Sequence, residues 1–351
     1  GLVVMQSLLA ACLDAGARLA EPGEFTRRAF LEGKLDLAQA EAVADLIDAA
    51  SQEAARSAMR SLNGEFSATI GALVAQLVEL RALTEAMLDF PEEEVDTVHR
   101  DDAAARLQAV GRALDEVLAK SRQGSLLRSG IHVVLAGRPN VGKSSLLNRL
   151  AGEERAIVTP IAGTTRDALR EPIQIQGVPL TLVDTAGLRE ASDTIEQFGI
   201  ERTQREVAQA DLVLLVEEAG TPAPPLPGLG SRAQRVVVYN KLDLAPQFKP
   251  PAGAIAVSAK TGRGLEELRA AILAAAGWSS TGESVFLARE RHLRALGTAR
   301  GHLDAARGQL GRWEFFAEEL RLAHSALGAI TGEFTADDLL GQIFSRFCIG
   351  K

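Results

Sequence analysis

The chain has 351 residues and a formal net charge of −8, so it is long enough for two or three domains, and its acidic balance excludes a surface that holds nucleic acid over its whole extent. Its two cysteines, Cys12 and Cys348, stand at opposite ends, which excludes a disulfide framework and is typical of a reducing cytoplasm. We find no apolar run near the ~18–20 residues of a membrane span and no signal peptide, so we expect a cytoplasmic protein that does not contact a membrane.

Helical texture dominates the N-terminal region of the chain. The sequence begins inside an apolar helical pattern, which we interpret as the middle of a domain, and we expect Cys12 to be a buried helical thiol there. Residues 35–120 are rich in Ala and Leu, and Leu73, Leu77 and Leu80 recur at helical spacing. This spacing predicts long helices that bury one apolar face.

Short β-rich runs alternate with helical stretches between residues 131 and 277. The runs are apolar and β-branched, which favours strands buried on both faces of a mainly parallel sheet. They are IHVVLAG, LTLVDTAG, DLVLLVEEAG, RVVVYNK and AIAVSAK. Because helical texture returns after Trp278, the simplest interpretation is one helical domain in two chain segments, with a nucleotide-binding domain inserted between them. Two separate helical domains are the alternative.

The stretch GRPNVGKSS begins at Gly137, directly after a predicted strand and before a predicted helix. It matches GxxxxGK[ST] in the context that a phosphate-binding loop requires. Gly137 and Gly142 allow backbone amides to surround the phosphates, Lys143 adds charge at the β- and γ-phosphates, and the Ser144 hydroxyl is a Mg²⁺ ligand. The phosphate-site residues predicted from this loop are Asn140, Val141, Gly142, Lys143, Ser144 and Ser145.

Three further motifs end predicted strands in the order that a guanine-nucleotide site needs. Asp184 of DTAG is the Mg²⁺-associated carboxylate, and NKLD supplies Asn240 and Asp243, which suit guanine because a carboxylate accepts from its N1–H and exocyclic amine. Lys241 would cover the ring and support the phosphate loop, and the backbone N–H of Ala259 would reach the guanine O6. The residues assigned here are Asp184, Thr185, Ala186, Gly187, Asn240, Lys241, Leu242, Asp243, Ser258, Ala259 and Lys260.

The stretch TPIAGTTRD (159–167) is either a polar loop or switch I, in which Thr165 would be the second Mg²⁺ ligand and the γ-phosphate sensor. Its assigned residues are Thr159, Pro160, Ile161, Ala162, Gly163, Thr164 and Thr165. In DTAGLRE, Leu188 stands where a Ras-like GTPase normally has the Gln that orients the attacking water. Water must therefore be positioned by another group.

Several stretches together resemble the MnmE (TrmE) family of tRNA-modifying GTPases over essentially the whole chain. They are GRPNVGKSSLLN, IAGTTRD, DTAGLRE, the terminal FCIGK and EPGEFTRRAFLEGKLDLAQAEAVADLI. The resemblance implies an α + α/β fold: a split all-helical domain with an inserted Ras-like P-loop G domain, whose mainly parallel sheet carries helices on both faces. The implied domains are a remnant of the folate-binding domain (1–33), the first segment of the helical domain (34–128), the G domain (129–277) and the second segment of the helical domain with FCIGK (278–351).

The resemblance also implies how water and charge are handled. Glu196, in ASDTIEQFG, aligns with the family's water-positioning Glu, whereas from the residues alone it would be a solvated helix charge. K⁺ would take the place of an arginine finger. Its implied ligands are Asn140, Thr159, Ile161 and Thr164.

The implied function is GTP hydrolysis, coupled to G-domain dimerisation, in tRNA wobble-uridine (U34) modification. The implied partners are tRNA, a second copy of the chain and an FAD-dependent protein of the MnmG/GidA type. The product is 5-carboxymethylaminomethyluridine, and 5-formyl- or 5,10-methylene-tetrahydrofolate is the one-carbon donor. Lys34 and Lys351 are the folate ligands carried over, with the folate site incomplete in this chain, and Cys348 is required for modification.

Two other functions are compatible with the nucleotide motifs. One is a regulatory GTPase of ribosome assembly with a helical effector domain, although such factors usually carry a basic RNA-binding domain. The other is a structural fragment that binds GTP without turnover. The segment LDLAQAEAVADLI and the terminal FCIGK discriminate against the ribosome-assembly GTPase.

Overall fold

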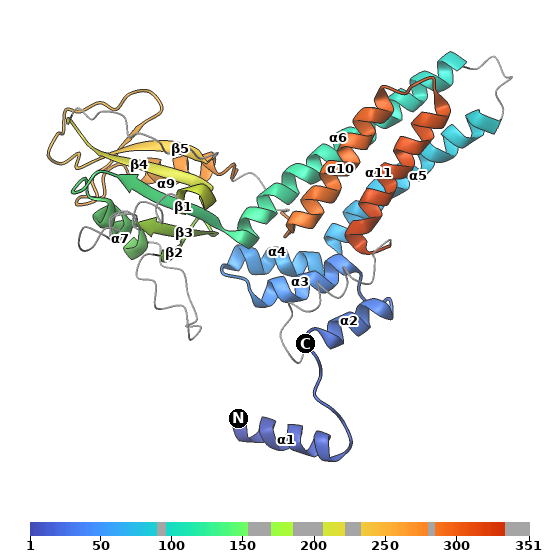
Figure 1. Ribbon diagram of the computed structural model, residues 1–351, viewed down its shortest axis with the longest axis horizontal. Coiled ribbons are helices and arrows are strands. Elements are labelled where there is room, and N and C mark those ends of the chain that lie inside the picture. Colours follow the sequence, from blue (N-terminus) through green and yellow to red (C-terminus); the bar gives the residue numbers. More distant parts are fainter. Residues whose placement is uncertain (90–95, 154–169, 185–205, 222–232, 280–284, 334–351) are drawn as a thin grey trace, which may run out of the picture. The chain divides into compact units, whose positions relative to one another are not determined.

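The computed structural model describes residues 1–89, 96–153, 170–184, 206–221, 233–279 and 285–333 (Figure 1). The chain divides into two compact units, and each is described separately. The helical unit comprises Gly1–Asp48, Arg56–Ser121 and Phe286–Lys351, and the α/β unit comprises Ala49–Ala55 and Arg122–Val285. The fold class is therefore α + α/β, as the sequence predicts.

Among the described residues, eight helices lie wholly or partly in the helical unit. They are α1 (Leu2–Asp14), α2 (Glu24–Leu31), α3 (Leu37–Ile47), α4 (Gln52–Leu62), α5 (Glu65–Asp89), α6 (Asp96–Ser129), α10 (Glu290–Arg307) and α11 (Trp313–Thr331). Helices α5, α6, α10 and α11 run alongside one another (Figure 1) and share one apolar core. Leu73, Leu77 and Leu80 are buried in it with Leu296 and Leu303, so the predicted helical spacing is confirmed.

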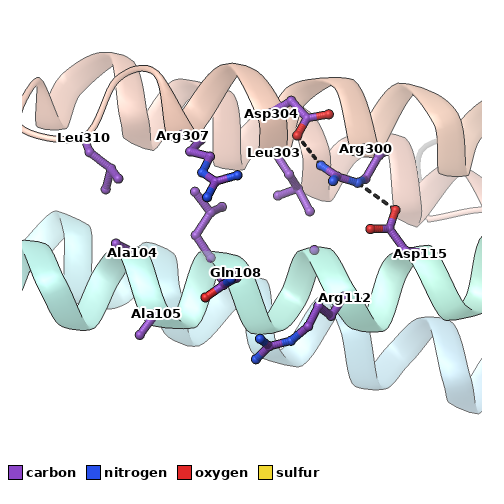
Figure 2. Close-up of a pocket in the computed structure, with 12 residues that line it drawn as sticks. Ala104, Ala105, Gln108, Arg112, Asp115, Arg300, Leu303, Asp304, Arg307 and Leu310 are labelled. Atoms are coloured by element: carbon purple, nitrogen blue, oxygen red, sulfur yellow. Dashed lines mark hydrogen bonds and ion pairs between the residues drawn. The ribbon is translucent and has the colours of Figure 1, made fainter.

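A groove of about 440 Å³ lies between α6 and α10. Small side chains such as Ala104 and Ala105 leave this space open along α6 (Figure 2). Arg300 of α10 crosses it, donating from Nε to Asp115 Oδ1 at 2.7 Å and from Nη1 to Asp304. These contacts connect α10 to α6 beside the apolar core.

Helix α1 contradicts one expectation. Cys12 is helical as predicted, but it is exposed rather than buried. Val3, Met5 and Leu8 of the same helix are 73%, 66% and 60% exposed. Apolar helical spacing identifies a helix, but it does not determine which element covers that helix, and in the described regions of the chain nothing covers these side chains.

Helix α5 corrects a second expectation. Among the described residues, the segment Glu65–Leu88 is long and apolar enough to cross a membrane by length and composition, with a mean hydropathy of 1.4. The expectation that no apolar run approaches this length was therefore wrong. A core helix of a soluble protein passes the same test, and Phe66, Leu77 and Leu80 of α5 belong to the helical core.

The α/β unit contains a six-stranded sheet in the order β2-β3-β1-β4-β5-β6. All neighbouring pairs are parallel except β2 with β3, which confirms a mainly parallel sheet. The strands are β1 (Ile131–Gly137), β2 (Arg170–Ile175), β3 (Val178–Asp184), β4 (Leu212–Glu218), β5 (Gln234–Asn240) and β6 (Ile255–Ala256). Helix α7 (Lys143–Glu153) follows β1, and helix α9 (Leu265–Ala275) follows β6.

Strand β2 was missed by the sequence interpretation. It forms a hairpin with β3 through Gln176 and Gly177, whose φ angles of 51° and 79° are both left-handed. Two positive φ angles in a two-residue loop define a type I′ turn, which Asn-Gly usually forms. Gln-Gly is a weaker signal for the same turn.

Candidate nucleotide-binding site

The phosphate loop wraps around the Lys143 side chain. Strand β1 ends at Gly137 and α7 begins at Lys143, so the loop connects a buried strand to a helix N-terminus. Lys143 is only 4% exposed, and its Nζ donates to the carbonyl oxygens of Gly137 at 3.0 Å and Arg138 at 2.7 Å. The ammonium is therefore held inside the loop. The loop ends at the N-terminus of α7, and a helix N-terminus favours anions such as phosphate groups.

Gly142 cannot be replaced without strain. Its φ of 90° is left-handed, and a β-carbon there would lie 2.4 Å from Nδ2 of Asn240. The glycine lets the NKLD asparagine approach the loop backbone. The second glycine of the GxxxxGK pattern is therefore required by its left-handed backbone and by the close approach of Asn240, and not by loop flexibility alone.

Ser144 and Asp184 form the predicted Mg²⁺-associated pair. The hydroxyl of Ser144 donates to Oδ2 of Asp184 at 2.5 Å, and Asp184 is 7% exposed at the end of β3. The register that pairs Leu135 with Asp184 places this carboxylate beside the phosphate loop. A hydroxyl and a carboxylate oxygen are the hard ligands that Mg²⁺ prefers, so these residues fit that ion.

The side chain of Asn240 in NKLD forms hydrogen bonds with the phosphate loop and with SAK. Its side chain, with the residue 2% exposed, donates from Nδ2 to the carbonyls of Val141 at 3.0 Å and Gly142 at 3.3 Å. Its Oδ1 accepts from the backbone N–H of Ala259 at 3.1 Å. The sequence assigned Asn240 and Ala259 to the base. The structure joins them to each other and to the phosphate loop, a linking role that the motif pattern did not reveal.

Asp243 remains exposed, as a base-recognising carboxylate should. Its Oδ1 accepts from the hydroxyl of Ser258 at 2.6 Å. This hydrogen bond, helped by the charges of Lys260 and Lys241, holds the pKa of Asp243 below its usual value, because it outweighs the desolvation of the carboxylate. The carboxylate is therefore kept ionised and able to accept from a guanine edge.

Lys241 pairs with a residue that the sequence interpretation did not single out. Its Nζ lies 2.7 Å from Oε2 of Glu218. The parallel pairing of β4 with β5 sets Glu218 opposite Asn240, which brings the carboxylate to this edge. The feature of the sequence that could have indicated this pairing is the glutamate at the end of the predicted strand DLVLLVEE.

The predicted site residues divide into three groups. The structure brings together at one edge of the sheet Asn140, Val141, Gly142, Lys143, Ser144, Ser145, Asp184, Asn240, Lys241, Leu242, Asp243, Ser258, Ala259 and Lys260. Lys34 belongs to the helical unit, where it is exposed and its Nζ pairs with Oε2 of Glu32 at 2.7 Å. Outside the described residues lie Thr159, Pro160, Ile161, Ala162, Gly163, Thr164, Thr165, Thr185, Ala186, Gly187, Leu188, Glu196, Cys348 and Lys351.

A phosphate loop, a hydroxyl–carboxylate pair and an exposed, ionised carboxylate lie where the parallel strands of one sheet end. This arrangement defines a P-loop GTPase. Two family models match the chain: the MnmE helical domain over residues 37–348 and the GTP-binding protein TrmE N-terminus over residues 1–34. The chain belongs to the MnmE family of tRNA modification GTPases. Membership of this family favours a tRNA modification GTPase over the alternative of a ribosome-assembly GTPase.

Curated relatives extend the match across the whole chain. The tRNA modification GTPase MnmE of Dechloromonas aromatica (strain RCB) is 60% identical over 365 residues, which cover 100% of this chain and 81% of the relative. The protein of the same name from Azoarcus sp. (strain BH72) is also 60% identical, over 362 residues that cover 100% of this chain and 80% of the relative.

Solved structures align with a smaller portion of the chain. The G domain of the T. maritima FeoB iron transporter is 27% identical, with a TM-score of 0.32, over 42% of this chain and 98% of that chain. A point variant of Aquifex aeolicus Era bound to GDP.AlF4- is 24% identical, with a TM-score of 0.31, over 49% of this chain and 66% of that chain.

Proposed function

We propose that this GTPase acts in modification of the tRNA wobble uridine, U34, together with an FAD-dependent partner of the MnmG/GidA type. The product would be 5-carboxymethylaminomethyluridine. The observation that carries the proposal is the joint match of the helical and N-terminal family models, over residues 37–348 and 1–34. Relatives named tRNA modification GTPase MnmE support it, because they match the chain from end to end.

The hydrolysis step would use groups already placed at the sheet edge. The loop amides and Lys143 would hold the phosphates, and Ser144 with Asp184 would hold Mg²⁺, joined by Thr165. Mg²⁺ would neutralise charge on the phosphate oxygens. Leu188 has no hydrogen-bonding group in its side chain, so another group must orient the attacking water. By the resemblance to the MnmE family, this group would be Glu196.

A potassium ion would complete the charge balance at the phosphates. Its proposed ligands are Asn140, Thr159, Ile161 and Thr164. Asn140 is the member of this set within the described residues; it is exposed, at a left-handed φ of 64° at the tip of the phosphate loop. The ion would stabilise transition-state charge, the task that an arginine finger performs elsewhere.

The modification step would draw on the other end of the chain. Folate would be the one-carbon donor, with Lys34 and Lys351 among its ligands, and Cys348 would be required for modification. GTP hydrolysis would be coupled to dimerisation of the nucleotide-binding domains within a cytoplasmic homodimer. Nucleotide state would thereby control chemistry at a separate site.

The hydrolysis model is tested by GTP turnover in KCl against NaCl at equal ionic strength. We expect faster turnover in KCl. Equal rates in the two salts would remove K⁺ from the proposal. The variant Glu196→Ala should keep its GTP affinity within about threefold while turnover falls by about 100-fold or more, because a water-positioning group acts mainly in the transition state. Unchanged turnover would remove Glu196.

The modification model is tested with Cys348→Ser and nucleoside mass spectrometry of tRNA. We expect GTP turnover equal to that of the wild type, with loss of 5-carboxymethylaminomethyluridine. Normal modification by this variant would refute the role of Cys348.

A further inference from the structure

The helical unit contains a largely buried ionic cluster that includes none of the residues assigned to the nucleotide site. Glu41 and Asp45 of α3 meet Arg289, Arg291 and His292, which lie at the start of α10. The side chains of Glu41 and His292 are each 2% exposed. Glu41 and Arg291 are 250 residues apart in sequence, so the cluster joins two distant segments of the chain.

Arg291 is the centre of this cluster. Its guanidinium donates to both carboxylate oxygens of Glu41, from Nε at 2.8 Å and from Nη2 at 2.6 Å. The same group donates to the carbonyls of Ala329 at 2.9 Å and Ile330 at 3.0 Å, in the last turn of α11. Carbonyls at a helix C-terminus lack intrahelical partners, so Arg291 both caps α11 and connects it to α3.

His292 and Arg289 complete the hydrogen bonding around Glu41. The Nδ1 of His292 accepts from the backbone N–H of Arg289 at 3.1 Å, so the proton of a neutral ring is on Nε2, which donates to Glu41 at 2.9 Å. Arg289 donates to Oδ1 of Asp45 at 2.7 Å. Buried charges of this kind are a poor means of raising stability compared with apolar packing, and their best-supported use is to specify one arrangement.

The structural feature that this cluster fixes is the C-terminal end of α11. Gly332 ends this helix with a left-handed φ of 95°. A β-carbon there would lie 2.9 Å from the Phe30 ring and 3.1 Å from Cβ of Leu37. The backbone thus passes closely against α2 and α3, the two helices that flank the turn carrying Lys34. Beyond this point the sequence continues to Cys348 and Lys351.

We propose that Arg291 and Glu41 are positioning residues for tRNA modification: together they fix the last turn of α11, after which the backbone at Gly332 passes against the helices on either side of the turn that carries Lys34. This inference rests on the proposed function for the role of Cys348. It goes beyond that function by assigning a task to a cluster with no contact to nucleotide motifs among the described residues.

The test compares Arg291→Lys with the matched control Arg294→Lys. Lysine keeps the charge but cannot span two carboxylate oxygens and two carbonyls at once. Arg294 is on the same helix, and among the described residues its exposed side chain pairs with Glu290 of its own helix at 2.7 Å. Three quantities are measured for each protein: hydrogen exchange, GTP turnover and U34 modification.

For Arg291→Lys we expect exchange of the Gly332 and Glu333 amides, which both donate to the Gly328 carbonyl, to rise about tenfold or more, because the local cap is weakened. Exchange in the middle of α5 and α10 should stay as in the wild type, GTP turnover should stay within about twofold, and modification should fall about tenfold. Arg294→Lys should match the wild type in all three. A purely structural role would raise exchange throughout the helical unit.

Unchanged exchange at Gly332 and Glu333, or unchanged modification despite faster exchange there, would overturn the proposal. If Arg291→Lys fails to fold, Glu41→Gln provides the second variant, since it keeps the shape of the carboxylate and removes its charge. A wild-type protein that produces no modified uridine would refute the proposed function, and with it the link to modification, while the exchange data would still decide whether the cluster holds the end of α11.

Discussion

Gly142→Ala tests whether the phosphate loop depends on the close approach of Asn240. The substitution adds one carbon at a residue whose φ is 90°. That carbon would lie 2.4 Å from Nδ2 of Asn240, the atom that bonds the carbonyls of Val141 and Gly142. Either the loop or the asparagine must move, and both belong to the nucleotide site.

The magnitude follows from two contributions. A left-handed φ costs a residue with a β-carbon roughly 1–2 kcal/mol. Displacing Asn240 loses its two hydrogen bonds to the loop carbonyls, each contributing about 1 kcal/mol. If this loss of about 3–4 kcal/mol falls on the binding-competent loop, nucleotide affinity should drop roughly 100- to 700-fold.

The assay is titration of the protein with a fluorescent GDP analogue. The control is Gly152→Ala in α7, where an added β-carbon meets nothing within 4 Å. This control should leave affinity unchanged and stabilise the helix by up to about 1 kcal/mol. Affinity of Gly142→Ala within about threefold of the wild type would refute the steric reasoning.

Two further predictions concern ions and protons. Ser144→Ala removes the hydroxyl that bonds Asp184, so the strengthening of GTP binding by Mg²⁺ over EDTA should fall at least about tenfold; an unaltered Mg²⁺ effect would contradict this. Burial lowers the pKa of His292 below its usual 6.5, and burial of Glu41 is outweighed by hydrogen bonds from His292 and Arg291, which hold its pKa below the usual 4.5. The unfolded chain therefore takes up these protons first, and the Tm should fall as pH decreases below about 6.5 and again below about 4.5; a Tm that rises on acidification from pH 7 to 5 would contradict this.

Much of the nucleotide site could be predicted because its chemistry is local in sequence. A loop of fixed length between β1 and α7 sets the phosphate contacts of Lys143 and Ser144, and NKLD follows one strand directly. Those spacings are dictated by the ligand, so they are visible without a structure.

Contacts between distant segments could not be predicted in this way. The pairing of Glu218 with Lys241 depends on the register of β4 with β5. The bond from Asn240 to Ala259 requires two strand ends to meet. Glu41 and Arg291 are 250 residues apart in sequence, and only the packing of α3, α10 and α11 brings them together.

Exposure was the least predictable property. The sequence predicts a buried Cys12 in α1, yet Cys12 is exposed, and so are Val3 and Met5 of the same helix. Helical periodicity reports which residues share a face, whereas burial requires a second element on that face.

We propose that GTP hydrolysis by this protein drives wobble-uridine modification. Its most direct test is the fraction of U34 carrying 5-carboxymethylaminomethyl in cells that lack the gene and are supplied with either the wild type or Glu196→Ala. The account predicts that the wild type restores the modified nucleoside and that Glu196→Ala does not, although it still binds GTP. Full restoration by Glu196→Ala, or none by the wild type, would contradict it.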